Sequence, residues 1–450
     1  MTGKRYLKTG KRSVKRVKYK KFSVGEEEKA LCGESINCMM LGGGIYPAME
    51  TELFELDGLT RVVYGSSNGI MKIVRGTRGG TQEKYFAYVA GDGQLYVYDF
   101  DQGGFRGVGH TFPYPPETFC VYTADGKELT VFATEHGIVT LDYINVPKTV
   151  YWYASRAAFY FHDRIFVGYG NSLRYCAHQD YEDWTESADE GGRIDFPSED
   201  GDIVGGAVIG EKCYLFFERG IKRLEATGAA RDFFAVDVPY DGADIIEGSC
   251  RAVGKYVFFL TREGAMRFDG ETVEQICLGM DIQPQNVKEQ CESVVYEDQV
   301  YIKYWDWRGY KKFLVADVGR GKGYFLAPDE CTGLSVSDGR LLCVRGVRFA
   351  YFKPAGSQTS NIKRRFEVKD FDFGIDGDKL MKKVRIEGGG TVYLTIYGER
   401  GNREGTVMAF DLSSGADEEY PLVRGKRFSF AIELGEGGFV TALTAEIAAF

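Results

Sequence analysis

Residues 86–101 have the sequence FAYVAGDGQLYVYDFD, in which two short apolar runs flank a polar turn that contains Gly91 and Gly93. Apolar and polar residues alternate in both runs, which is the period of two expected for a β-strand with one buried face. A glycine-centred turn between two such runs predicts a β-hairpin. The stretch therefore predicts antiparallel β-structure.

The same hairpin pattern recurs six more times along the chain. Its further copies lie at 131–143, 165–176, 215–228, 257–270, 301–317 and 341–352. The anchor positions of the seven hairpins are Tyr88, Val131, Phe166, Phe216, Phe259, Ile302 and Leu342. Their mean spacing of about 42 residues is typical of four-stranded propeller blades. We expect an all-β fold with a β-propeller of six to eight blades, seven being favoured.

An eighth candidate hairpin, residues 61–76, precedes the first clear one and belongs either to the same blade or to the strand that closes the ring. Residues 280–294 lack alternation and predict a short helix between blades. After Lys353 the pattern changes to about six strands, and their length fits a β-sandwich of about 100 residues. We therefore expect a basic arm at 1–30, a propeller at 31–356 and a C-terminal sandwich at 357–450.

Positive charge is concentrated at the N-terminus. Residues 1–21 contain no acid and ten basic residues: Lys4, Arg5, Lys8, Lys11, Arg12, Lys15, Arg16, Lys18, Lys20 and Lys21. Without these ten charges the overall net charge of −9 becomes −19 for residues 22–450. An acidic body argues against a broad nucleic-acid surface. The basic residues are the candidate partner-binding site, and we expect residues 1–21 to order only against a partner. The alternative is a solvated tail.

No segment resembles a signal peptide or a membrane span, because no apolar run reaches about 18 residues. The ten cysteines are scattered without Cys-x-x-Cys spacing, and several lie inside expected strands. They fit small buried hydrophobic residues of a protein made in a reducing cytosol, and we expect no disulfide within the propeller.

Catalytic and metal-binding signatures are missing from the sequence. The four histidines, His110, His136, His162 and His178, show no zinc-ligand spacing, and no nucleophile elbow, P-loop or dinucleotide motif occurs. We therefore expect no catalytic residue, no cofactor and no metal. The acidic stretch 180–202 contains ten Asp or Glu residues. It is either a solvated loop or a cation site, which the sequence leaves open.

Three segments carry a resemblance to a known family. They are NSLRYCAHQDYEDWTES (171–187), DIVGGAVIGEKCYLFFERGIKRLEATG (202–228) and GSCRAVGKYVFFLTREGAMRFDGETVEQI (248–276). Together they resemble the packaged-DNA stabilisation proteins, or tail nozzle and hub proteins, of short-tailed bacteriophages. The later stretches VKDFDFGI (368–375), KKVRIEG (382–388), TVYLTIYG (391–398) and RFSFAIEL (427–434) are similar to the sandwich that follows such propellers.

The resemblance implies a non-enzymatic virion structural protein of the phage tail or neck, assembled in the host bacterial cytoplasm. It implies a homo-oligomer, a hexameric ring, that joins portal-side or adaptor proteins to other tail proteins. Phage DNA would pass through the ring transiently during DNA ejection, and no membrane is involved. An acidic body would let the DNA slide without sticking.

Two other classes of function stay open at this point. The first is a carbohydrate-binding or carbohydrate-hydrolysing propeller used as a host-surface adhesin, although the Ser-x-Asp-x-Gly-x-x-Trp boxes of sialidase-type propellers are missing. The second is a cellular interaction scaffold of the WD or kelch kind, whose repeat signatures do not recur here. A glycan site needs aromatic rings and carboxylates that converge on one mouth of the propeller, whereas a ring subunit needs large side-on contacts.

Overall fold

The computed structural model describes residues 15–22, 32–41, 44–54, 70–78, 82–89, 94–99, 104–111, 118–124, 126, 129–141, 147–276, 282, 284, 291–306, 309, 311–317, 323–326, 331–337, 340–345, 348–353, 363–371, 377–398 and 405–449. These residues form two compact units. One contains 49–277 and 282–353, and the other contains 1–48, 278–281 and 354–450. In the described parts of both units, the only helical segments are two 3-10 turns, η1 (Ser198–Asp200) and η2 (Ala230–Asp232).

Strand pairing divides the first unit into seven antiparallel sheets of four strands each, which confirms the propeller and the favoured number of blades. In chain order the blades are blade 1 (β6 Ile70–Arg78, β7 Gln82–Val89, β8 Gln94–Asp99, β9 Gly104–Thr111), blade 2 (β10 Thr118–Tyr122, β11 Leu129–Thr134, β12 Gly137–Leu141, β13 Pro147–Tyr151), blade 3 (β14 Ala157–Phe161, β15 Arg164–Tyr169, β16 Ser172–Tyr175, β17 Gly192–Asp195), blade 4 (β18 Ile203–Ile209, β19 Lys212–Phe217, β20 Gly220–Glu225, β21 Phe234–Val238), blade 5 (β22 Arg251–Val253, β23 Tyr256–Thr261, β24 Gly264–Phe268, β25 Val273–Ile276), blade 6 (β26 Glu292–Tyr296, β27 Gln299–Trp305, β28 Lys311–Asp317, β29 Gly323–Leu326) and blade 7 (β30 Cys331–Ser337, β31 Arg340–Arg345, β32 Arg348–Lys353, β5 Glu50–Phe54).

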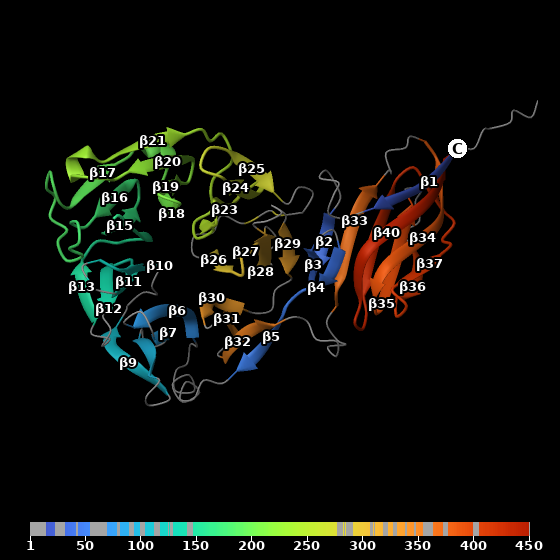
Figure 1. Cartoon of the computed structure of the whole chain (residues 1–450), viewed down its shortest axis with the longest axis horizontal. Helices are drawn as coiled ribbons and strands as arrows, with labels where there is room; N and C mark the ends of the chain where they lie inside the picture. The colour runs from blue at the N-terminus through green and yellow to red at the C-terminus, as the bar shows by residue number, and fades with distance from the viewer. Residues whose placement is uncertain are drawn as a thin grey trace, which may run out of the picture. The chain divides into compact units, whose positions relative to one another are not determined.

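The blades form a closed ring (Figure 1). From blade 2 to blade 7, the first strand of each blade lies beside the first strand of the next, and β6 of blade 1 contacts both β30 and β11. Blade 7 combines the two ends of the propeller sequence, because β5 pairs with β32 in an antiparallel register that joins Glu50 to Lys353 and Phe54 to Phe349. The closing strand is thus β5, while β6 of blade 1 takes up the end of the candidate hairpin 61–76.

The core of the propeller lies between neighbouring blades. One cluster joins Phe166 and Leu173 of blade 3 to Leu215 and Leu224 of blade 4, and others join blade 2 to blade 3 and blade 4 to blade 5. The middle strands β11 and β12 are consequently buried on both faces, whereas the sequence pattern predicted one buried face. A blade needs two apolar faces because a neighbour covers each of them.

The predicted helix at 280–294 lies largely outside the described residues. The residues that the structure describes there are not helical: Pro284 forms an isolated bridge with Asp306, and β26 begins at Glu292.

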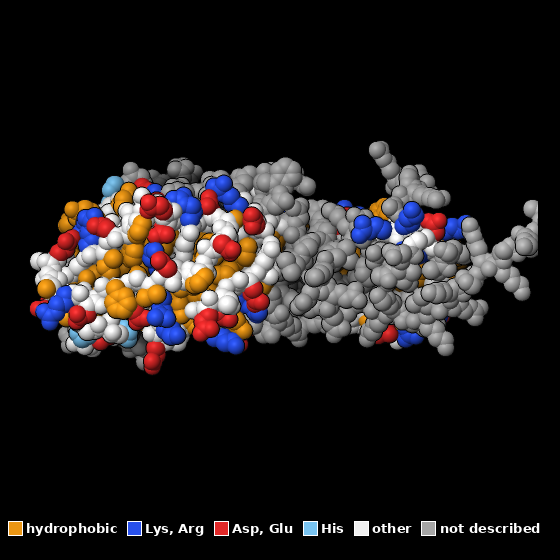
Figure 2. Space-filling view, turned by 90° about the horizontal axis from the view of Figure 1, so that it is seen from above, with side chains coloured by type: hydrophobic (Ala, Val, Ile, Leu, Met, Phe, Trp, Pro, Cys, Tyr) orange, Lys and Arg blue, Asp and Glu red, His pale blue; other side chains and the backbone are white. Residues whose placement is uncertain are grey.

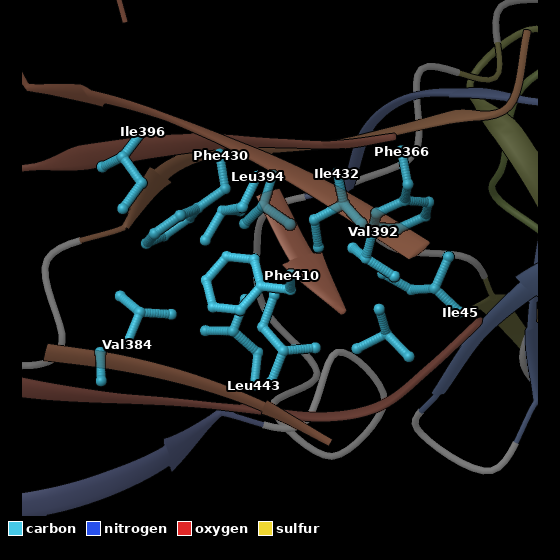
Figure 3. Packing of buried hydrophobic residues seen from close by; sticks show 14 of the residues in the cluster. Ile45, Phe366, Val384, Val392, Leu394, Ile396, Phe410, Phe430, Ile432 and Leu443 are labelled. Carbon is cyan, nitrogen blue, oxygen red and sulfur yellow. The ribbon is translucent and has the colours of Figure 1, made fainter. Parts of the chain in front are cut away.

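The second unit is a β-sandwich, as expected for the C-terminal part. Its first sheet contains β3 (Cys38–Leu41), β4 (Gly44–Pro47), β40 (Phe439–Ala449), β34 (Lys379–Gly389), β37 (Ala416–Glu419), β38 (Val423–Gly425) and β1 (Lys15–Phe22). Its second sheet contains β2 (Cys32–Ile36), β33 (Arg365–Phe371), β39 (Phe428–Leu434), β35 (Thr391–Gly398) and β36 (Thr406–Asp411). Side chains of both sheets, such as Phe410, Phe430 and Leu443, meet in a buried apolar layer (Figure 3).

The N-terminal boundaries differ from those predicted, because the sandwich uses both ends of the chain. The expected arm at 1–30 contains β1, which pairs with β40 from Lys15↔Ala449 to Phe22↔Leu443. The expected propeller range 31–356 contains β2, which pairs with β33, and β4, which pairs with β40. The physical reason is that β40 and β33 each leave one edge of hydrogen-bonding groups open, and N-terminal strands satisfy those edges.

Removal of β1 tests this correction. In a chain lacking residues 1–22, we expect the free energy of unfolding of the sandwich to fall by at least about 1 kcal/mol, because each lost backbone hydrogen bond contributes about 0.5–1.5 kcal/mol net. Denaturant unfolding followed by circular dichroism measures the change. A chain lacking only residues 1–13 is the control and should unfold like the full chain. Equal stability of the full chain and the 1–22 deletion would show that β1 does not support the sandwich.

Candidate functional site

The ten basic residues of the predicted partner-binding site are divided between described and undescribed parts of the chain. Lys15, Arg16, Lys18, Lys20 and Lys21 belong to β1. Lys4, Arg5, Lys8, Lys11 and Arg12 lie outside the described residues. At least the second half of this basic segment is therefore part of a sheet, and the prediction that residues 1–21 order only against a partner is wrong for β1.

The acidic stretch 180–202 lies mostly between β16 and η1, and four of its ten carboxylates are paired with four separate cations of other segments. Glu182 pairs with Lys148 at 2.5 Å, Glu186 with Arg174 at 3.1 Å, Asp189 with Arg231 at 3.1 Å and Asp200 with Lys222 at 3.0 Å. Lys148 belongs to blade 2, and Lys222 and Arg231 lie in and beside blade 4. The stretch thus connects blade 3 to its neighbours, and its carboxylates do not converge on one point.

Calcium should not stabilise this arrangement, because a calcium site needs six to eight oxygen ligands around one centre. We expect the melting temperature to stay the same in 5 mM calcium and in 5 mM EDTA. Differential scanning fluorimetry measures it, with magnesium as the control for ionic strength. A rise in melting temperature of about 2 °C or more that is specific to calcium would contradict the one-by-one pairing.

Two of the four histidines, His162 and His178, line a polar cavity of about 500 Å³ between blades 3 and 4. His162 and Asp163 form the turn between β14 and β15, and both have positive φ angles, 44° and 57°, as a two-residue hairpin turn requires. Nε2 of His178 lies 3.7 Å from Asp163. Asp163 also accepts hydrogen bonds from Tyr160 at 2.6 Å and Gln179 at 3.2 Å. These two hydrogen bonds hold the pKa of Asp163 below its usual value.

Arg164 lines the same cavity, and its side chain holds neighbouring segments of blade 3 together. Its side chain is buried, and Nη1 donates to the carbonyls of Cys176 at 2.9 Å and Glu190 at 2.7 Å. Its guanidinium also lies over the ring of Phe233, 5.4 Å from the centre. Burial lowers the pKa of Arg164. The arginine therefore ties both ends of the long connection between β16 and β17 to the blade. Within the part of the chain that the structure describes, no group of three His, Cys, Asp or Glu residues is placed to hold a metal ion.

The most exposed large apolar side chain among the described residues is Trp152, with 78% of its surface accessible. It follows β13 of blade 2, between Tyr151 and Tyr153. The ring of Tyr151 stacks on Tyr153, with centroids 5.2 Å apart, and on Trp184, with centroids 4.6 Å apart. Tyr153 is 58% exposed. A row of aromatic rings thus runs from a partly buried tryptophan to the surface.

Charged side chains of blade 3 border this aromatic row. The guanidinium of Arg174 lies over Tyr153, 4.5 Å from the ring centre, and also pairs with Glu186. Arg193 is opposite Arg174 in the register of β16 and β17. We call this surface the rim patch, because it consists of outer strands of blades 2 and 3 and their connections: Tyr151, Tyr153, Ser172, Arg174, Trp184, Glu186, Arg193 and Asp195.

The polar half of the rim patch is held in place by its own hydrogen bonds. Asp195 accepts hydrogen bonds from Nε of Arg193 at 2.6 Å and from the hydroxyl of Ser172 at 2.5 Å. These bonds, the first the stronger, lower the pKa of Asp195. Arg174 and Arg193 balance Glu186 and Asp195, so the patch carries no net charge. Figure 2 likewise shows basic and acidic side chains interspersed over the visible face of the propeller.

Sequence reasoning missed the rim patch. The only local signal was the run Tyr-Trp-Tyr at 151–153, since the charged partners come from β16, β17 and the connection between them in the next blade.

Seven cysteines have described side chains, and none of these seven is in a disulfide bond: Cys38, Cys120, Cys176, Cys213, Cys250, Cys291 and Cys343. Burial raises the pKa of Cys120, Cys176 and Cys250 to about 12. The thiolate is the reactive form, so these thiols should be inert near neutral pH.

Alkylation at pH 8 tests the state of these three thiols. We expect iodoacetamide to leave Cys120, Cys176 and Cys250 unmodified in the folded protein and to modify them in 6 M guanidinium, with or without reductant. Peptide mass spectrometry reads out each site. Labelling of any of the three within minutes in the folded protein, or a requirement for reductant after unfolding, would contradict this description.

Comparisons with known proteins find similar folds and no family for this chain. No protein-family model matches the chain, and no curated protein matches it. Among solved structures, the chain is similar to the extracellular domain of a one-component system of B. thetaiotaomicron (10% identity, TM-score 0.46, covering 90% of this chain and 62% of that one). It is also similar to the WD40 domain of SCAP from fission yeast (8% identity, TM-score 0.41, covering 89% and 94%).

A third similar structure is PorZ, a surface component of the type-IX secretion system of Porphyromonas gingivalis, with 13% identity, a TM-score of 0.39 and coverage of 76% and 44%. The chain therefore spans less than two thirds of the length of the first and the third of these structures. At such low identity the similarities concern the fold alone, and the seven four-stranded sheets define that fold independently. The described residues include no helix that is long and apolar enough to cross a membrane.

Proposed function

We propose that this protein is a non-catalytic structural subunit of a short-tailed bacteriophage tail or neck, of the nozzle or hub kind. The proposal rests on the sequence resemblance over residues 171–276 and on one structural observation. That observation is the insertion of a closed propeller into a sandwich that is itself assembled from both ends of the chain.

The insertion gives the propeller a covalent connection to the sandwich at each end of the propeller sequence. Both leave from paired strands of blade 7, since Glu50 of β5 and Lys353 of β32 are register partners. The side chains of Lys353 and Glu52 form an ion pair at the same place. A force applied to the propeller is therefore shared by two hydrogen-bonded strands, which shear together. Such a construction suits a part that transmits mechanical load within a particle better than it suits a freely diffusing domain.

The charge distribution is also consistent with a ring around a DNA channel. Residues 1–21 carry a charge of +10, and residues 22–450 carry −19. An acidic lining repels the phosphate backbone and prevents DNA from adhering to the channel. Subunits in such a ring contact one another head to tail, through two different surfaces. The partners in this proposal are further copies of the chain, six in the ring, together with portal-side or adaptor proteins and other tail proteins in the virion.

Single-particle electron microscopy and mass photometry of the purified full chain test the proposal. We expect a closed ring, six copies being the expectation from the resemblance, with lateral interfaces above about 1,000 Å² each. Purified virions of the phage that encodes the chain should contain it in the tail or neck. A strict monomer at about 50 µM that is also missing from particles would reject the proposal.

A further inference from the structure

We propose that one basic corner of the sandwich is the surface with which each copy of the chain binds the acidic face of the propeller of a second copy. The inference rests on the association of copies in the proposed function, and it names the two surfaces that meet. It does not depend on where in a virion the assembly lies.

Strand register brings basic residues of distant segments together at this corner. Arg16 of β1 and Leu380 of β34 are both register partners of Ala448 in β40. On its other side, Leu380 is the partner of Arg424 in β38. The next row of the sheet contains, in the same order, Lys15, Ala449, Lys379 and Gly425. The turn between β38 and β39 adds two more cations. We call this part of the sandwich the basic corner and define it by Lys15, Arg16, Lys379, Arg424, Lys426 and Arg427, together with the acid Asp378.

Lys379 places an unbalanced positive charge inside the corner. The residue is 1% exposed. Its ammonium group donates to the carbonyl oxygen of Gly377 at 3.1 Å and to that of Lys426 at 2.5 Å, and it forms no ion pair with any described acidic residue. Carbonyl groups satisfy its hydrogens but do not neutralise its charge, and a buried charge without a counter-ion is costly. An acidic partner at the corner would reduce that cost, because water screens a buried charge less than an exposed one.

The exposed cations of the corner also lack acidic partners. Arg424, Lys426 and Arg427 are exposed and form no ion pair with a described residue. Elsewhere in the same sheet, cations lie beside carboxylates, since Lys383 pairs with Glu418. Three exposed cations within four residues repel one another. Such a surface favours contact with a surface of opposite charge.

The two units of the chain have opposite net charges. The unit that contains the sandwich has 24 Lys or Arg and 20 Asp or Glu, and the propeller unit has 32 Lys or Arg and 45 Asp or Glu. The net charges are therefore +4 and −13. Opposite charges on two surfaces of one chain steer copies toward a head-to-tail contact between unlike units.

Negative charge is concentrated on one face of the propeller. Turns between the first and second strands leave the same end of each antiparallel blade as connections between the third and fourth strands, so both lie on one face of the ring. In blades 3 to 6, the described segments of this kind are 162–163, 176–191, 210–211, 226–233, 254–255, 269–272 and 297–298. They contain 13 Asp or Glu residues and two Lys or Arg residues. We call these segments the acidic face.

Several carboxylates of the acidic face are available to a partner. Glu190, Glu211 and Glu271 belong to three successive blades, and all three are exposed. Their side chains form no ion pair with a described cation. A surface with carboxylates spread over three blades is wide enough to contact the several cations of the basic corner at once.

Nucleic acid is the competing occupant of the basic corner, because phosphates also bind exposed arginines. A duplex-binding surface is broadly basic, whereas the whole unit that contains the sandwich carries a net charge of only +4. A second copy offers a propeller with a net charge of −13. The charges therefore favour a second copy over nucleic acid.

Charge reversal in the full-length chain tests the contact. One variant is Arg424→Glu/Lys426→Glu, and the other is Glu190→Lys/Glu211→Lys/Glu271→Lys. Mass photometry and sedimentation velocity measure the concentration at which half of the chain is associated. We expect each variant to raise this concentration at least about tenfold, because like charges then face each other. Both sets of substitutions in one chain should return it to within about threefold of the original value, because the facing charges are opposite again.

Lys363→Glu is the matched control for a reversed cation of the sandwich. Lys363 is exposed and precedes β33, whose Arg365 pairs with Glu433 at the end of β39 that lies away from the basic corner. Its association should equal that of the unmodified chain. Raising sodium chloride from about 50 mM to about 500 mM should weaken association of the unmodified chain, because salt screens the contact. Circular dichroism verifies that each variant is folded, and fluorescence anisotropy with a 20-base-pair duplex measures binding of DNA.

The outcomes separate this contact from the ring proposal. A monomeric unmodified chain at up to about 50 µM would reject the ring, and the contact with it. Rings that neither reversal weakens would leave the ring proposal standing and overturn the contact. The contact would also be overturned if Lys363→Glu weakened association as much as Arg424→Glu/Lys426→Glu, or if the combined variant did not recover. The same holds if the duplex binds the unmodified chain and Arg424→Glu/Lys426→Glu abolishes only that binding.

Discussion

The middle strands of blades 2 to 6 are buried on both faces, and this single constraint determines most of the fold. Strands such as β11 and β12 are buried on both sides, so an isolated blade would expose a large apolar surface to water. Only a ring gives every blade two neighbours, and a ring must have a seam. The seam here lies inside blade 7, where three strands from the end of the propeller sequence pair with β5 from its beginning. Opening the seam therefore breaks a sheet and not merely a contact between sheets.

The sandwich is also built from strands that are far apart in the sequence. β40 lies between β34 on one edge and the N-terminal strands β1 and β4 on the other. The apolar layer around Phe410 and Phe430 is covered on one side by a sheet that contains residues from positions 15 to 449. The sandwich is consequently complete only when strands from both terminal parts of the sequence are present, and the propeller only when both ends of its own segment are present. The basic residues of β1 also place charge on a strand that pairs on one side, which is a common way to keep sheet edges from aggregating.

The sequence predicted the repeating part of this fold well and its non-local part poorly. The hairpin anchors from Tyr88 to Leu342 led to the correct number of blades, because hairpins are local and their glycine turns are visible in the sequence. The closing strand β5 was not identified, since its partner β32 comes from the opposite end of the propeller sequence and nothing in ETELF distinguishes a seventh-blade strand from any other. The lysine-rich strand β1 was interpreted as an arm because its many charges do not show the apolar and polar alternation typical of a strand. Its pairing partner, β40, is more than 400 residues away in the sequence and could not be inferred from residues 15–22. The rim patch was missed for a related reason: Tyr151 and Tyr153 are visible in the sequence, but Arg174, which lies over both rings, is brought to them by the packing of two blades. The prediction of single-sided burial failed because the sequence of a strand does not reveal how many neighbours will cover it.

The seam in blade 7 has a consequence for the order in which the protein is made. A ribosome completes β5 about 290 residues before it reaches β32, which corresponds to about 15–60 s of synthesis at about 5–20 residues per second. During that time β1 to β5 have emerged, but β32, β33 and β40, with which β5, β2 and β1 pair, do not yet exist. Until β32 has been synthesised, β5 therefore lacks its partner strand in blade 7 and the ring cannot close. Because β33 and β40 follow the propeller in the sequence and pair with β2 and β1, the sandwich can form only after the whole propeller has been synthesised.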